Sequence, residues 1–133
     1  MSDETRVLAG IPLLALVTVE TGGLYLLKLW RSSEGVTEFQ VGFARAGHAH
    51  AGVLLVLSLT ALLYADAADL SGGWGWIARS GVPVAAILMP AGFFFSSMGA
   101  GRTKPNGLIA LVLAGAAVLA LGLATLGVGL LTA

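Results

Sequence analysis

Two histidines separated by one residue are the side chains in this sequence best suited to hold a cofactor. His48 and His50 lie in the run GHAHAG at 47–52. Imidazole binds copper, zinc and iron, and it is a common axial ligand of haem. Each residue of an α-helix turns by about 100°, so this spacing places the two rings about 200° apart in projection. We therefore expect the rings to serve two sites, or one site and one contact between subunits, rather than to chelate a single ion.

The two histidines are expected on different faces of their helix. His50 shares its face with small and weakly polar residues, as in the interior of membrane bundles; these are Gly47, Leu54, Ser58, Ala61 and Ala65. His48 shares its side with Gly52, Leu55 and Leu59, which would otherwise face lipid or another subunit. We predict that His50 is the inward ligand and that His48 serves a second site or a neighbouring protomer. The alternative for both is an interhelical hydrogen bond.

Glu20 is the third candidate, because it lies well inside the apolar run 7–30. An ionised carboxylate at the centre of a membrane helix costs on the order of 3 kcal/mol. At a rise of about 1.5 Å per residue, Glu20 lies roughly as deep as His50 on the next helix. We predict that Glu20 is a hydrogen-bond partner or proton carrier beside His50. The alternative is a protonated carboxyl, or one that is hydrogen-bonded to Thr18 or Tyr25.

Residue types exclude much other chemistry. The chain has no Cys, which excludes disulfides, thiolate metal sites and iron–sulfur clusters. Its formal net charge is +0, so we expect no nucleic-acid partner. Ser96 and Ser97 have no neighbouring base motif, and the loop 99–107 lacks the spacing of a phosphate-binding loop, so nothing indicates a hydrolase. Whether the chain is an enzyme stays open. Met89 and Met98 are interpreted as packing residues.

The elements that must position the three candidates are membrane helices. Of the 133 residues, 57% are hydrophobic and only 11% are charged, whereas soluble domains carry roughly 25% charged residues. Crossing a bilayer takes about 20 apolar residues. Runs of this kind cover residues 7–30, 43–65, 82–100 and 108–131. We therefore expect an all-α integral membrane protein, a bundle of four transmembrane helices that forms one domain over residues 1–133.

The last two runs supply packing surfaces. Phe93, Phe94 and Phe95 are expected to form one wall of a pocket at the level of Glu20 and His50. Asn106 is expected to cap the last helix. That helix is expected to pack through a stripe of small residues at near four-residue spacing, namely Ala116, Ala120, Ala124 and Gly127. Residues 66–80 and 101–107 are expected to be water-exposed connections.

Basic residues are unevenly distributed along the chain. Those near the first and third connections are Lys28, Arg31, Arg45, Arg102 and Lys104, whereas Arg6 and Arg79 lie on the other side. Since basic residues favour the cytoplasmic side, we expect both termini to be non-cytoplasmic. Trp30, Trp74 and Trp76 are placed as interfacial anchors. We expect a multi-pass protein of the bacterial cytoplasmic (inner) membrane.

The run GHAHAGVL resembles the G-H-x-H-x-G stretch in the catalytic subunit of haem-copper oxidases, especially the cbb3-type branch. In that family two histidines on opposite faces of one helix ligate two different haems. The resemblance implies haem b as the cofactor, held by His48 and His50. The oxidase subunit has twelve helices in three four-helix arcs, so this chain is similar to one arc, and a homotrimer would rebuild the arrangement. The chain lacks the further histidines that complete a bis-histidine haem and the copper site.

A second resemblance extends over more of the chain. The segments FARAGHAHAG, GFFFSSMG and TKPNG are similar to those of uncharacterised small actinobacterial membrane proteins. This likeness implies a four-helix membrane protein and no particular activity.

Three functions are compatible with these features. The first is a membrane protein that binds haem or a metal ion at the His48, His50 and Glu20 site and takes part in redox chemistry; copper or another transition metal is the alternative to haem, as is no cofactor. The second is a non-catalytic structural or assembly subunit of a larger membrane complex. The third is a small oligomeric transporter or proton path that uses Glu20. Besides the lipid bilayer, the expected partner is a second copy of the chain, with a trimer favoured, or that larger complex.

Topology gives the first testable prediction. If the connection at 101–107 is cytoplasmic, a single cysteine at Thr103 reacts with a membrane-impermeant thiol reagent only after the cells are opened. Labelling of intact cells at this position would contradict the predicted orientation.

Overall fold

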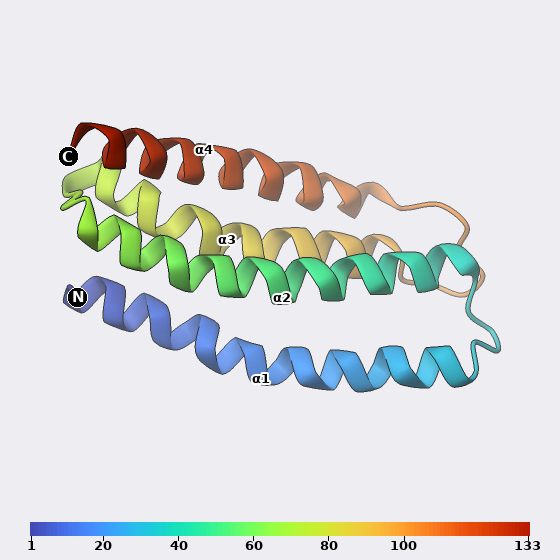
Figure 1. The fold of residues 1–133 in the computed structure, drawn as a ribbon. Helices are drawn as coiled ribbons and strands as arrows, with labels where there is room; N and C mark the ends of the chain where they lie inside the picture. Colours follow the sequence, from blue (N-terminus) through green and yellow to red (C-terminus); the bar gives the residue numbers. More distant parts are fainter.

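The computed structural model describes residues 1–133, and all of its regular structure is helical (Figure 1). The four long helices are α1 (Asp3–Arg31), α2 (Glu38–Ala67), α3 (Gly72–Ser96) and α4 (Ala110–Thr132), and the short 3-10 helix η1 (Gly107–Ile109) precedes α4. Four helical stretches are long and apolar enough to cross a membrane, the last being η1 together with α4. The prediction of an all-helical chain with four candidate spans is therefore confirmed.

Local sequence signals explain where the helices begin. Thr37 and Gln40 form a capping box at the start of α2, in which each side chain accepts a hydrogen bond from the backbone of the other residue. Asn106 caps the start of η1, where its side chain accepts a hydrogen bond of 2.8 Å from the Leu108 amide. The predicted cap is confirmed, with a 3-10 turn between it and α4.

Helix α3 begins earlier than the predicted apolar run 82–100. Residues 72–80 form its first turns, so the prediction of a connection over all of 66–80 is wrong. Gly72 takes a positive φ of 60° and lets the chain turn into the helix, rather than breaking it. After Gly73, no proline occurs until Pro83, and the helix continues through both Pro83 and Pro90.

The helices run antiparallel in chain order and form an open bundle (Figure 1). Helix α3 packs most extensively against α2 and α4, α1 packs mainly on α2, and α1 and α4 do not touch. Helices α2 and α3 each contact all three of the other long helices. Both termini lie at one end, and the α1–α2 and α3–α4 links lie at the other.

Glycines bring α3 and α4 into close contact. A Cβ atom at Gly81 would lie 2.6 Å from the Gly122 Cα, and one at Gly115 would lie 2.5 Å from the Met89 Cγ. Gly115, Gly122 and Gly129 are buried at intervals of seven residues along α4. The predicted packing stripe is therefore wrong: Ala116, Ala120 and Ala124 are exposed, and no atom lies within 4 Å of a Cβ at Gly127. Gly115 and Gly122 face α3 instead, and Gly129 contacts Leu70.

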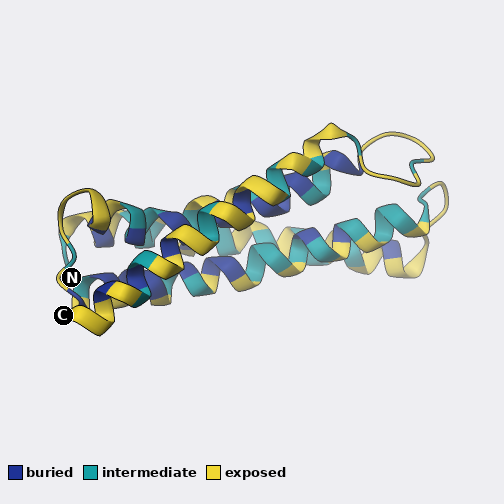
Figure 2. Cartoon of the chain, turned by 90° about the horizontal axis from the view of Figure 1, so that it is seen from above, coloured by how far each residue is buried: buried dark blue, intermediate teal, exposed yellow.

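Buried residues are confined to the seams between helices (Figure 2), and many large apolar side chains are exposed on the outer faces. Leu14, Leu113 and Leu131 are more than 70% exposed. Helix α1 buries only Thr5, Pro12 and Leu29. This distribution suits a chain whose surroundings are hydrocarbon, where apolar side chains carry no cost on the outside.

The glycine contact predicts a selective loss of stability. Gly122→Ala places a Cβ atom 2.8 Å from the Gly81 Cα and forces α3 and α4 apart. We expect the free energy of unfolding in detergent to fall by about 1 to 3 kcal/mol, as for other overpacked sites. Gly127→Ala is the matched control, because no atom lies within 4 Å of its Cβ position. Equal melting of the two variants would show that the contact does not stabilise the bundle.

Candidate functional site

His48 lies in the seam between α1 and α2. A Cβ atom at Gly22 would lie 3.0 Å from the His48 Nδ1, and one at Gly23 would lie 3.6 Å from its Cε1, so the two glycines make room for the imidazole. The ring also lines a groove of about 420 Å³ with Val19 and Gly52. Helix α1 therefore packs on the side of α2 that carries His48, which the sequence alone assigned to a second site or to a neighbouring subunit.

His50 lies toward α3 instead. Its Nδ1 is 2.8 Å from the Ala46 carbonyl oxygen, one turn earlier on α2, and its ring is 4.9 Å from that of Phe93. Because a carbonyl oxygen only accepts, Nδ1 is assigned as the protonated donor. This tautomer carries its lone pair on Nε2, the arrangement found in metal-ligating histidines.

The two rings therefore point into different helix seams, as their spacing predicts. Each ring offers one ligand nitrogen in its own seam, and the two rings do not converge on one site. No group of three or more His, Asp or Glu side chains gathers where it could hold a metal ion. A site at either histidine therefore needs its remaining ligands from a cofactor, from a small molecule or from another chain.

No hydrogen bond or ion pair joins Glu20 to either histidine. Contacts from Val19 to Gly52 and from Gly22 to His48 place it level with residues 49–51 of α2, close to the depth expected. Its side chain is nevertheless exposed on α1, and the ion pairs of the chain use other carboxylates. The alternative hydroxyl partner, Thr18, donates to the Ala15 carbonyl oxygen. Glu20 thus has no polar partner within its own chain.

The predicted aromatic wall is not one surface, because Phe94 and Phe95 line a groove that Phe93 does not line. Phe93 contacts His50, whereas Phe94 fills the space beside Gly47, where a Cβ atom would lie 3.0 Å from its ring. Phe93 also belongs to a row of aromatic rings that leads to the start of α2 through Phe43, at 5.5 Å, and Phe39, at 4.2 Å from Phe43. Phe39 and Phe43 are additions that the sequence interpretation missed.

The best-connected polar group was also missed. Asp66 lies just beyond the apolar run 43–65, at the end where the termini meet. It accepts hydrogen bonds from the Ser2 amide at 2.7 Å, the Thr5 hydroxyl at 2.7 Å and the Arg79 guanidinium at 3.2 Å. Arg79 also donates to the Thr5 hydroxyl and to the Leu70 carbonyl oxygen. These bonds join α1, α2 and α3. The only signal in the sequence was an acidic residue, Asp66, and a basic residue, Arg79, near the two ends of the second predicted connection.

The hydrogen bonds determine the charge of Asp66. Burial by itself raises the pKa of this carboxyl, but the bonds from Thr5, Ser2 and Arg79 together hold its pKa well below the usual range. The Asp66 cluster is therefore an ionised structural junction rather than a proton donor at neutral pH.

The comparisons add no relative. No protein-family model matches this chain, and neither the characterised proteins nor the solved structures include a significant match.

The Asp66 cluster predicts a pH-dependent stability. Because folding lowers the pKa of Asp66, the stabilisation is present above its ordinary value of 3.8 and is lost progressively as the pH falls below it. At neutral pH we expect Asp66→Asn to lower the free energy of unfolding by about 1.5 to 3 kcal/mol, the range for hydrogen bonds to a charged group. Unfolding in detergent, followed by circular dichroism from about pH 7 to pH 3, measures both effects.

Asp69→Asn is the control for this prediction. Asp69 is exposed and takes a positive φ of 49°, which Asn also tolerates. We expect it to keep the stability and acid sensitivity of the original chain. An Asp66→Asn protein that behaves in the same way would show that the cluster contributes nothing.

Proposed function

We propose that this chain is an integral membrane protein that holds haem b, or else a transition-metal ion such as copper, at its intramembrane histidines and serves redox chemistry. His50 would hold the group through Nε2, and His48 would serve a second ligand position. The observation that carries this proposal is the 2.8 Å contact between the His50 Nδ1 and the Ala46 carbonyl oxygen. It fixes the ring and directs the free lone pair to the nitrogen that binds a metal.

The donor set suits haem better than a bare ion. A structural metal site needs about four protein ligands. Haem already supplies four nitrogen ligands to its iron and needs only one or two ligands from the protein. Each seam offers one imidazole. When bound, haem supplies one-electron transfer at its iron. What the chain itself does is hold the imidazole of His50 against Phe93 and exclude water with apolar helices.

The single imidazole at each location favours a homo-oligomer, in which another copy supplies the second ligand. A trimer is the form that the oxidase resemblance implies. Glu20 enters at such a contact: an exposed carboxylate midway along α1 costs on the order of 3 kcal/mol against lipid, and a covering protomer relieves that cost. Glu20 would then act as a hydrogen-bond partner or proton carrier between chains. The proposed location is the bacterial cytoplasmic membrane, with both termini outside, on the strength of the basic residues near the links.

A second function rests on the same exposed Glu20. A non-catalytic subunit of a larger membrane complex would present this carboxylate to a polar group on another protein. In that case His48 and His50 do no more than fill their seams.

Absorption spectroscopy of purified protein tests the proposal. The chain is produced with an adequate haem supply, purified in mild detergent and examined for a Soret band, for haem by the pyridine haemochrome method and for bound metals. We expect His50→Ala to abolish the signal of haem or metal held by His50. Ser58→Ala is the matched control, because it also removes a side-chain hydrogen bond to the carbonyl oxygen one turn earlier on α2.

The outcomes separate the two functions. Loss of the chromophore or metal in His50→Ala but not in Ser58→Ala supports a ligand role for His50. An original chain that is colourless and metal-free, and that co-purifies with a larger complex, rejects the cofactor proposal and favours the subunit function.

A further inference from the structure

Two oppositely charged side chains within the apolar runs have no partner in the chain. Glu20 lies in the run 7–30, and Arg45 lies near the link end of the run 43–65. Both are exposed, and neither forms an ion pair, because the ion pairs of the chain join other residues. Since a charge that faces lipid is costly, each of the two side chains needs an opposite charge from outside its own chain.

Arg45 lies on one continuous face of the α1–α2 pair. It lines a recess of about 420 Å³ together with Leu29 and Trp30 of α1. The groove beside His48 lies on the same stripe of α2, because its lining residues follow Arg45 at intervals of four, three and four residues. These are Ala49, Gly52 and Val56, and Val19 of α1 lines the same groove. We call this surface the Arg45 face.

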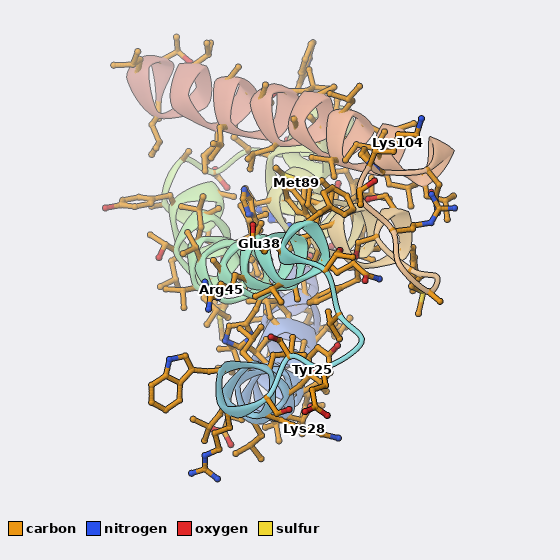
Figure 3. The ribbon with its side chains drawn as sticks, turned by 90° about the vertical axis from the view of Figure 1, so that its right-hand side faces the viewer. Tyr25, Lys28, Glu38, Arg45, Met89 and Lys104 are labelled. Carbon is orange, nitrogen blue, oxygen red and sulfur yellow. The ribbon has the colours of Figure 1, made fainter.

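Glu20 borders the Arg45 face on α1. At about 100° per residue, Glu20 lies about 100° around the helix from Val19 and about 80° from Trp30, which both belong to this face. Lys28, in contrast, lies about 160° from Trp30, and Figure 3 shows it on the side of α1 away from α2, whereas Arg45 projects from α2. The unpaired acid and the unpaired base therefore border the same outer surface, one on each helix.

The two charges also lie at similar depths. Glu20 is level with residues 49–51 of α2, so Arg45 is four to six residues nearer the link end, or about 6 to 9 Å along the axis. The long side chains of arginine and glutamate can close such a separation by leaning toward each other. A two-fold axis along the membrane normal leaves every residue at its own depth, so the same separation applies between two copies.

We propose that a second copy of this chain packs on the Arg45 face about such a two-fold axis, with Glu20 of each copy paired to Arg45 of the other. An isologous contact of this kind satisfies both charges of both copies, because the acid and the base border one surface. Ala49 and Gly52 are small and allow the helices to approach closely.

This contact rests on the homo-oligomer of the proposed function and gives it a surface, but it does not depend on the cofactor. It forms a dimer rather than the trimer that the oxidase resemblance implies, because two complementary charges on the same face are both satisfied by one partner.

Co-purification of two differently tagged full-length copies measures the contact. The copies are produced in the same membrane, extracted in mild detergent and captured through one tag, and the second tag is then quantified. We expect the original copies to capture each other. Among Glu20→Lys copies alone, or Arg45→Glu copies alone, like charges meet at both contacts, so we expect the captured fraction to fall at least about tenfold.

A mixture of the two variants separates a contact between chains from one within a chain. When a Glu20→Lys copy meets an Arg45→Glu copy, each contact again joins an acid and a base, so we expect capture to return. A pair within one chain could not be restored by mixing, because each variant would keep its own like charges. Lys28→Glu in place of Arg45→Glu is the matched control: it reverses a charge on the far side of α1 and is expected to restore nothing.

Glu20→Gln and Arg45→Gln provide the same comparison without reversed charges. Their mixture keeps one of the two ion pairs, whereas either variant alone keeps none, so we expect the mixture to be captured more than either variant alone.

Original copies that do not capture each other overturn the proposal. Mixtures of helical variants that stay apart also overturn it, as does equal restoration by Lys28→Glu. Since no readout here uses a chromophore or a bound metal, failure of this contact is distinguishable from failure of the cofactor proposal.

Discussion

Helix α2 touches each of the other three helices, and its turn of about 100° per residue determines which neighbour every one of its side chains can reach. His48 and His50 are separated by a single residue, yet the first contacts α1 and the second contacts Phe93 on α3. No rotation of side chains brings the two rings together. Any cofactor chemistry in this protein is consequently divided between two seams, each with one imidazole.

The packing of the seams is of the kind that a lipid solvent requires. Lipid is as apolar as the helix surfaces, so burial of leucine gives little drive for association, and close van der Waals contact must supply it. The glycines of α3 and α4 allow such contact, and Gly22 and Gly23 do the same for the ring of His48. Where α1 meets α2 at the opposite end, the hydrogen bonds of Asp66 add the polar attachment that small residues alone do not provide.

Much of the architecture could be predicted, because the number and length of apolar runs reflect a bilayer of fixed thickness. The faces were harder to assign. The stripe of Ala116, Ala120 and Ala124 and the row of Gly115, Gly122 and Gly129 differ by one position or two on the same helix, and only the three-dimensional partner decides between them. The divergence of the histidines followed from helix geometry alone, whereas the place of Glu20 depended on which face α1 turns to α2. The Asp66 cluster joins Ser2, Thr5 and Arg79 across long sequence separations, and no local pattern encodes such a meeting.

The absence of contact between α1 and α4 gives this bundle two free sides, much as an open β-sheet ends in two edge strands. A closed four-helix ring has no place for another helix, but a layer with edges can be continued. Helix α1 buries only three of its residues and leaves a broad exposed face, so another helix can be added beside it without any change to the glycine contacts of α3 and α4. In this architecture, the addition of a helix at the α1 edge is independent of the contacts that hold α3 and α4 together.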